Sequence, residues 1–193
     1  MSDVHTYSVR RSLLENERRW TLDDRCLSWS APDDPKDSGH IECRGIRRIR
    51  LQWTGSRFDH ARYQCRVTAA SGLSETIVST HFAGVARFED RSDVYRPFVR
   101  ALIGRVGAAN PACQFVAGVS PLKYIFNAMF LLVSFALLFL VLLTIGIPLH
   151  WLIITKLTVI AFLLPLVLRW LKQNRPRRFS PESIPADTLP PGT

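Results

Sequence analysis

Two clusters of arginine are the residues of this chain best suited to binding chemistry. The first cluster consists of Arg10, Arg11, Arg18 and Arg19, and the second consists of Arg44, Arg47, Arg48 and Arg50. A guanidinium group binds a carboxylate or a phosphate through two parallel hydrogen bonds. Each cluster therefore predicts a contact with anionic lipid headgroups or with a protein partner. The alternative for each is an ordinary solvated strand surface, because Glu15 and Glu17 interrupt the first cluster.

No group of residues predicts catalysis. The five histidines stand singly, at positions 5, 40, 60, 81 and 150. The chain contains no nucleophile elbow, zinc-protease motif, phosphate-binding loop or dinucleotide fingerprint. Because an enzyme needs several groups in a defined geometry, we expect a protein that is not an enzyme and has no catalytic residue, cofactor or metal.

The four cysteines do not predict a metal site or a redox pair. They are Cys26, Cys43, Cys65 and Cys113. No two of them form a C-x-x-C pair, which zinc sites and thioredoxin-like proteins use. We expect free thiols that pack as small hydrophobic side chains.

A long uncharged segment in the second half of the chain predicts a membrane anchor. Tyr124–Thr155 contains no Asp, Glu, Lys or Arg, and Gly146-Ile147-Pro148 interrupts it. Because a helix crosses a bilayer in about 20 residues, we expect two transmembrane helices, at about 124–147 and 150–171.

The charged and aromatic residues around this segment predict its orientation. Lys123 precedes the first predicted span, and several basic residues follow the second. Basic residues stay on the cytoplasmic side, so we expect both termini in the cytoplasm, at a bacterial-type inner membrane. Tyr124, Trp151 and Trp170 are expected at the membrane interfaces. We expect Lys156 to extend its side chain to the interface or to contact a polar partner.

The net charge of +9 does not by itself predict nucleic-acid binding. Basic residues are interleaved with acidic ones through the first 121 residues, and no nucleic-acid-binding motif occurs. The excess of basic residues lies beside the predicted spans, where anionic headgroups stabilise it.

The first 121 residues predict strands followed by one helix. The expected strands cover Tyr7–Leu13, Arg18–Leu22, Cys26–Trp29, Ile41–Trp53, Ala61–Ala69 and Glu75–Thr80. Asp23-Asp24 and Ser71-Gly72 are typical turns, and Ala31–Gly39 has the composition of a loop. Apolar residues recur with helical spacing from Val94 to Val106, which predicts a helix at about 92–107.

This order of elements resembles the pleckstrin-homology (PH) superfold over roughly residues 6–107. The resemblance lies in Ile41–Trp53, Tyr63–Ala69, Glu75–Thr80 and Val94–Val106, and the added hairpin is similar to small bacterial membrane proteins with PH-like domains. It implies an α+β domain, with a small antiparallel β-barrel or sandwich capped by one C-terminal helix. It also implies a binding or scaffolding role. The chain departs from the lipid-binding pattern at Glu15 and Glu17 and lacks the usual lysine.

These expectations combine into one architecture. Residues 1–121 form the PH-like domain, 122–171 the transmembrane hairpin, and 172–193 a basic, then proline-rich, disordered tail. The predicted function is a non-enzymatic scaffold at the cytoplasmic face of the membrane, which binds a protein partner or anionic lipid. The alternative is an oligomeric membrane component, such as a pore, transport or envelope subunit, in which the hairpin is the functional part.

Overall fold

The chain divides into two units. The computed structural model describes residues 4–55, 61–84, 87–144 and 174–191, together with seven single positions. These are Ile154, Thr158, Ala161, Pro165, Leu168, Leu171 and Lys172. One unit combines Met1–Gly118 with Arg177–Thr193, and the other is Val119–Pro176. We call them the strand unit and the helical unit.

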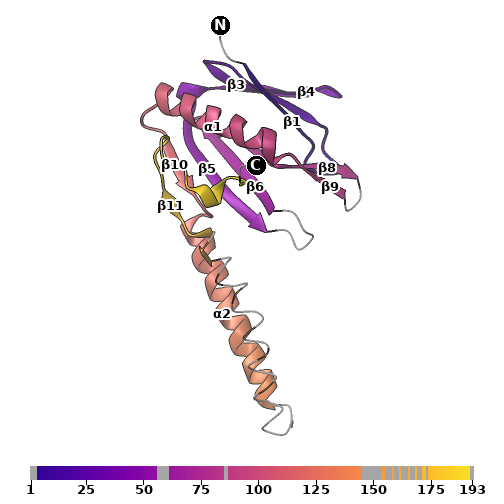
Figure 1. The fold of residues 1–193 in the computed structure, drawn as a ribbon, viewed down its shortest axis with the longest axis vertical. Helices are drawn as coiled ribbons and strands as arrows, with labels where there is room; N and C mark the ends of the chain where they lie inside the picture. Colours follow the sequence, from indigo (N-terminus) through magenta and orange to yellow (C-terminus); the bar gives the residue numbers. More distant parts are fainter. Residues whose placement is uncertain are drawn as a thin grey trace. The chain divides into compact units, whose positions relative to one another are not determined.

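The strand unit begins with a four-stranded antiparallel sheet in the order β1-β2-β3-β4 (Figure 1). Its strands are β1 (His5–Val9), β2 (Arg18–Leu22), β3 (Cys26–Ala31) and β4 (Asp34–Glu42). Alternate residues of the first three strands are buried, so one face of the sheet points into the core. Trp20 and Trp29 lie opposite each other on that face, with ring centroids 5.5 Å apart.

A second sheet has five strands in the order β11-β10-β5-β6-β7. They are β5 (Ile46–Gly55), β6 (Ala61–Ala69), β7 (Ser74–Val78), β10 (Gln114–Ala117) and β11 (Arg177–Arg178). β10 lies parallel to β5, whereas the other neighbours are antiparallel. A 3-10 turn, η1 (Cys43–Gly45), precedes β5, and β8 (Thr80–Gly84) and β9 (Arg87–Asp90) form a separate two-stranded ribbon.

Helix α1 (Ser92–Ala109) closes the core of the strand unit. Its buried side chains are Tyr95, Phe98, Val99, Leu102, Ile103 and Val106. Tyr7 of β1 contacts Tyr95 and Phe98 at ring centroid distances of 6.0 and 5.7 Å. Figure 1 shows α1 across the strands of the five-stranded sheet. The helix extends past the predicted end at about residue 107 and ends at Ala109. The side-chain amide of the next residue, Asn110, donates to the carbonyl of Ile46.

Two predicted boundaries in the first sheet were wrong. The strand expected at Tyr7–Leu13 ends at Val9, because the Arg10 side chain donates to the carbonyls of Leu13 and Glu15 and folds this segment into a loop. The loop expected at Ala31–Gly39 instead forms most of β4, which pairs with β3. Backbone pairing with a neighbouring strand outweighs local composition here.

The predicted disorder of the tail was also wrong over its described residues. β11 pairs with β10, and the tail continues through a second 3-10 turn, η2 (Ala186–Thr188). Phe179 contacts Phe115 with ring centroids 5.8 Å apart, and Leu189 is 3% exposed within the core. Pro181 lies so close to α1 that a Cβ at Gly107 would come within 2.8 Å of it. Burial of a few apolar side chains therefore orders a segment that is rich in proline.

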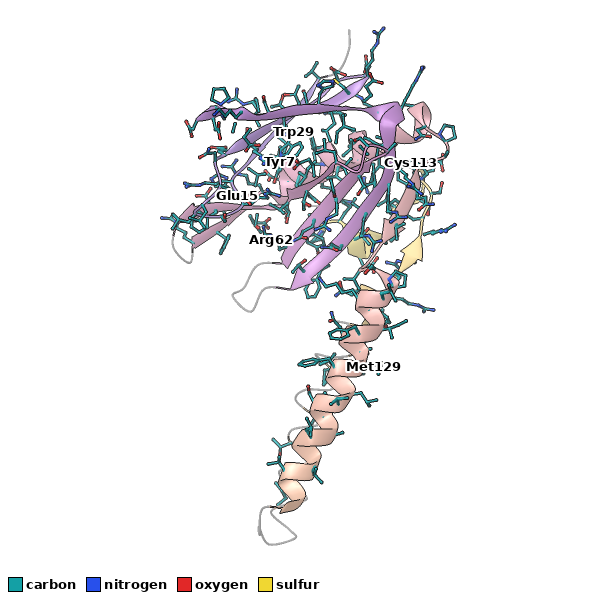
Figure 2. All side chains as sticks on the ribbon, turned by 180° about the vertical axis from the view of Figure 1, so that it is seen from behind. Tyr7, Glu15, Trp29, Arg62, Cys113 and Met129 are labelled. Atoms are coloured by element: carbon teal, nitrogen blue, oxygen red, sulfur yellow. The ribbon has the colours of Figure 1, made fainter. Side chains whose placement is uncertain are left out.

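The helical unit contains α2 (Pro121–Thr144). Large apolar side chains are exposed along it, including Leu122, Phe126 and Leu132, and Figure 2 shows Met129 among them. Tyr124 is half-buried near its first turn. The side chains of α2 that the structure describes without interruption run from Pro121 to Leu137.

The helices of the structure contradict the predicted transmembrane hairpin. Across the described residues, no helix has both the length and the apolar content that a bilayer crossing needs. The spans at 124–147 and 150–171, the hairpin in the fold class and the inner-membrane location with cytoplasmic termini were therefore wrong. The structure shows an α+β fold. Trp151, Lys156 and Trp170 lie outside the described residues.

We predict that Gly39→Ala destabilises the strand unit. A Cβ at Gly39 would lie 2.5 Å from the Trp29 ring, and overpacking of a core costs about 1–3 kcal/mol. Chemical denaturation of the full chain measures this loss. Gly45→Ala is the matched control, because nothing lies within 4 Å of its added Cβ. Equal stability of the two variants would contradict the packing of Trp29 on Gly39.

We also predict that Leu189→Ala lowers the free energy of unfolding by about 2–5 kcal/mol, the usual range for a buried leucine. Leu14→Ala is the control, because Leu14 is 96% exposed. We expect Leu14→Ala to change the free energy of unfolding by no more than about 0.5 kcal/mol. If thermal or urea unfolding gave both variants the same small effect, the tail would not contribute to the core.

Candidate functional site

The five-stranded sheet has one buried face and one face that carries arginines. Along β5, Ile49 and Leu51 are fully buried, whereas Arg48 and Arg50 between them are partly exposed. Successive residues of a strand point to opposite faces, so the two arginines share the outer face, as the sequence predicts. Figure 2 shows the side of β5 and β6 that α1 does not cover.

Neighbouring strands add two further arginines to this outer face. Arg66 of β6 lies directly opposite Arg50. On the other side of β5, Val116 of β10 is aligned with Arg50, and Arg178 of β11 is aligned with Val116. Residues directly opposite each other in paired strands point to the same face. We call the set of Arg48, Arg50, Arg66 and Arg178 the arginine face.

Uncharged polar side chains hold two of these arginines in place. Gln114 Oε1 accepts hydrogen bonds from Nε and Nη2 of Arg48, at 3.2 and 2.8 Å. Thr76 Oγ1 accepts a hydrogen bond from Nε of Arg66 at 3.3 Å. Beside them, Gln52 donates to Gln64 across β5 and β6 at 2.7 Å. The surface around the arginines is therefore polar, and its side chains have defined positions.

Within the described part of the chain, the arginine face lacks a carboxylate of its own. Glu75 is the one acidic residue in the five strands of this sheet. It lies opposite the buried Val67, on the other face, and it accepts from Nη1 of Arg18 at 2.9 Å. Among the described residues, no acidic side chain forms an ion pair with the four arginines. Like charges therefore face each other, with no carboxylate of the described part of the chain as a counter-ion.

Arg50, in the middle of the group, is repelled by the positive charges on either side of it. Partial burial lowers the pKa of Arg50, and the positive charges of Arg48 and Arg66 lower it further. The Arg50 guanidinium still carries its charge, because an arginine side chain is not deprotonated in proteins. An anion placed at this position would offset, by its attraction, both the cost of partly burying Arg50 and the repulsion from its neighbours.

The first predicted cluster, Arg10, Arg11, Arg18 and Arg19, does not form one surface that is open to a ligand. Arg11 forms an ion pair with Glu15 at 2.6 Å. Arg18 pairs with both Asp37 and Glu75, at 2.7 and 2.9 Å, and so connects β2, β4 and β7. Burial alone would lower the pKa of Arg18, but the hydrogen bond to Asp37 and the charge of Glu75 raise it.

The remaining members of that cluster also have separate positions. Arg10 donates to the backbone carbonyls of its own loop, and its guanidinium lies 5.8 Å from the ring centroid of Phe82. Arg19 is exposed on β2. Contacts with Glu15, Asp37 and Glu75 therefore use the charges of Arg11 and Arg18, two of the four arginines that the sequence predicted to be available for a ligand.

The second predicted cluster is only partly brought together. Arg47 lies at a register shift between Ile46 and Arg48 and is exposed, and Arg44 lies in η1. Arg66 and Arg178 were missed by the sequence interpretation. Arg66 lies between the apolar Cys65 and Val67, and this alternation could have predicted that Arg66 points to the outer face. Nothing in the local sequence indicates that Arg178 joins the sheet.

Arg62 of β6 is a further half-buried arginine near the loop between β1 and β2. Its Nε is buried without a hydrogen-bond partner among the described residues. Burial lowers the pKa of Arg62, the charge of Arg11 lowers it further, and the charge of Glu15 opposes both. Figure 2 shows Arg62 and Glu15 on the same side of the strand unit. This arginine therefore has a nearby carboxylate, unlike the arginine face.

The cysteines are free thiols, as the sequence predicts, and three of them are buried. Burial raises the pKa of Cys65 to about 12. A hydrogen bond to Asp23 is the main cause that raises the pKa of Cys26 to about 11. Both thiols therefore stay protonated near neutral pH. Within the described residues, no group of three or more His, Cys, Asp and Glu side chains is placed to hold a metal ion.

Comparison with known proteins does not assign the chain to a family. No family model, no curated protein and no solved structure matches it. The resemblance to bacterial PH-like proteins with a membrane hairpin was therefore wrong, since neither a matching family nor a membrane-spanning helix among the described residues supports it.

We predict that Arg66→Gln stabilises the strand unit by about 0.2–1 kcal/mol at low salt, because it removes one of two like charges that face each other across paired strands. The gain should shrink in high salt, which screens exposed charges. Urea unfolding at two salt concentrations measures both effects. Arg100→Gln, at an exposed position on α1, should change neither stability nor its salt dependence. A loss of stability in Arg66→Gln would contradict the repulsion.

Proposed function

We propose that the chain is a non-enzymatic binding module, and that its arginine face binds an acidic segment of a protein partner. One observation carries the proposal. Four arginines from three strands gather on one sheet face that has no carboxylate of its own among the described residues. Arginine recognises carboxylates in a planar geometry with two hydrogen bonds, and clusters of arginine are a recurrent means of binding acidic motifs.

The repulsion between these arginines destabilises the fold, and this supports a role for them in binding. Arg50 and Arg66 lie directly opposite each other, and like charges in that position destabilise a sheet. A residue choice that opposes stability without a compensating contact is expected at functional sites. The contrast with Arg18 is informative, because that arginine has two carboxylate partners within 3 Å. A partner's carboxylates would supply the counter-ions that the arginine face lacks.

The side chains between the arginines favour a protein over single-stranded nucleic acid. Proteins that bind single strands without sequence preference stack bases on aromatic side chains. The outward positions beside the arginines hold Gln52, Gln64, Thr68, Thr76, Gln114 and Val116. None of these is aromatic. Glutamine and threonine can instead donate to and accept from the backbone of a bound segment.

A charge-reversal experiment tests the proposed function. The full chain is titrated with a soluble acidic peptide, polyglutamate, and binding is measured by calorimetry at low and high salt. Arg50→Glu combined with Arg66→Glu should weaken binding at least about tenfold, a loss of about 1.4 kcal/mol. Binding by the unmodified chain should also weaken as salt rises.

The matched control is Arg19→Glu combined with Arg100→Glu, which changes net charge by the same amount at two exposed positions outside the arginine face. It should retain most of the affinity. Equal losses in the two double variants would mean that net charge alone attracts the peptide, and the proposal would fail. Stronger binding of a single-stranded oligonucleotide or of anionic lipid vesicles than of the peptide would also overturn it.

A further inference from the structure

Three members of the arginine face are close enough to act on one anion. Arg50 and Arg66 lie directly opposite each other, and neighbouring strands are about 4.8 Å apart. Arg48 lies two residues before Arg50 on the same face, a separation of about 7 Å along a strand. Gln114 holds the Arg48 guanidinium toward β10, and Thr76 holds the Arg66 guanidinium toward β7. An anion above Arg50 would therefore lie between these two groups.

The donors of these arginines are partly positioned and partly unused. Gln114 accepts from Nε and Nη2 of Arg48, and Thr76 accepts from Nε of Arg66. Among the described residues, Nη1 of Arg48 and both Nη groups of Arg66 donate no hydrogen bond. Fixing one edge of a guanidinium reduces the rotamer entropy that is lost on binding. The other nitrogens stay available to a ligand.

Arg178 extends the group on the far side of β5. Val116 separates Arg178 from Arg50 in the register of the sheet. Because the valine side chain is short and apolar, it does not compete for an anion between the two arginines. The tail therefore contributes a fourth positive charge beside the same position, through the pairing of β11 with β10.

We propose that the arginine face is a phosphoryl-binding site, and that the acidic segment of its protein partner is a phosphorylated one. This inference rests on the proposed function and names the ligand chemistry. A phosphorylated serine or threonine carries about −1.5 to −2 charge at pH 7 and three acceptor oxygens. It can accept from Arg48, Arg50 and Arg66 together. A carboxylate has a single charge and two oxygens, so it neutralises less of this group.

The dependence of binding on pH distinguishes the two anions. The charged groups that face the site are Arg48 and Arg50 on β5, Arg66 on β6 and Arg178 on β11. β7 and β10 present Thr76, Ser74, Gln114 and Val116, which do not titrate. The arginines stay charged throughout, so the pH dependence comes from the ligand. The second pKa of a phosphoryl group is about 6, whereas that of a glutamate side chain is about 4.3.

The test compares three peptides of one glycine- and serine-rich sequence that differ at a single central position. That position holds serine, glutamate or phosphoserine. Calorimetry with the full chain at pH 7.5 should give the phosphoserine peptide an affinity at least about tenfold higher than the glutamate peptide, a difference of about 1.4 kcal/mol. Lowering the pH to about 5 should remove most of that advantage, since the phosphoryl group then carries a single charge.

A conservative variant tests the role of the arginine geometry. Arg50→Lys keeps the charge but loses the planar fork, so it should reduce the preference for phosphoserine over glutamate several-fold. Arg19→Lys, which is outside the site, should leave the preference unchanged. Both variants keep the net charge, so a difference between them cannot come from general electrostatic attraction.

The outcomes separate this inference from the proposed function. Equal affinities for the glutamate and phosphoserine peptides, both lost in Arg50→Glu/Arg66→Glu, would overturn the phosphoryl site and leave the acidic-segment function standing. Binding of none of the three peptides and of no polyglutamate would overturn both. Phosphoserine binding that survives Arg50→Glu/Arg66→Glu would place the phosphoryl site elsewhere and overturn the inference.

Discussion

The structure depends on strand β5, which is paired on both sides and buried on one face. Ile49 and Leu51 are fully buried in the core of the strand unit, and β6 and β10 occupy the two edges of the strand. A shift of one residue would turn Arg48 and Arg50 into the core, at a large desolvation cost. The same constraint that builds the core therefore places these arginines together on the outer face.

The second constraint is that strands far apart in the sequence must pair to complete the five-stranded sheet. α1 connects the antiparallel strands to β10, which pairs in parallel with β5. The tail then adds β11 beyond β10, held by Phe179 against Phe115 and by the buried Leu189. Arg178 reaches the arginine face only because these apolar contacts fix the tail. Packing of the tail thus completes the arginine face, whose other members lie on β5 and β6.

The arginines of this chain have different roles because their neighbours differ. Arg18 joins three strands through Asp37 and Glu75, so its charge is used within the fold. Arg11 is held by Glu15. The arginine face has amides and hydroxyls as neighbours instead, and they position guanidinium groups without neutralising them. Only the second kind of arginine retains an electrostatic driving force for an external anion, because no carboxylate among the residues that the structure describes neutralises its charge.

The sequence by itself determined the local elements: β2 and β6 have the predicted bounds, and α1 begins at the predicted Ser92. It also determined that Arg48 and Arg50 share a face, because alternation is a local property of a strand. Only the tertiary structure decided that Arg66 and Arg178 join them, that Arg18 is paired, and that the tail is ordered. Composition predicted a membrane hairpin, a loop at Ala31–Gly39 and a disordered tail, and the structure contradicts all three. Strand partners and buried contacts come from residues far apart in the chain, so no local pattern encodes them.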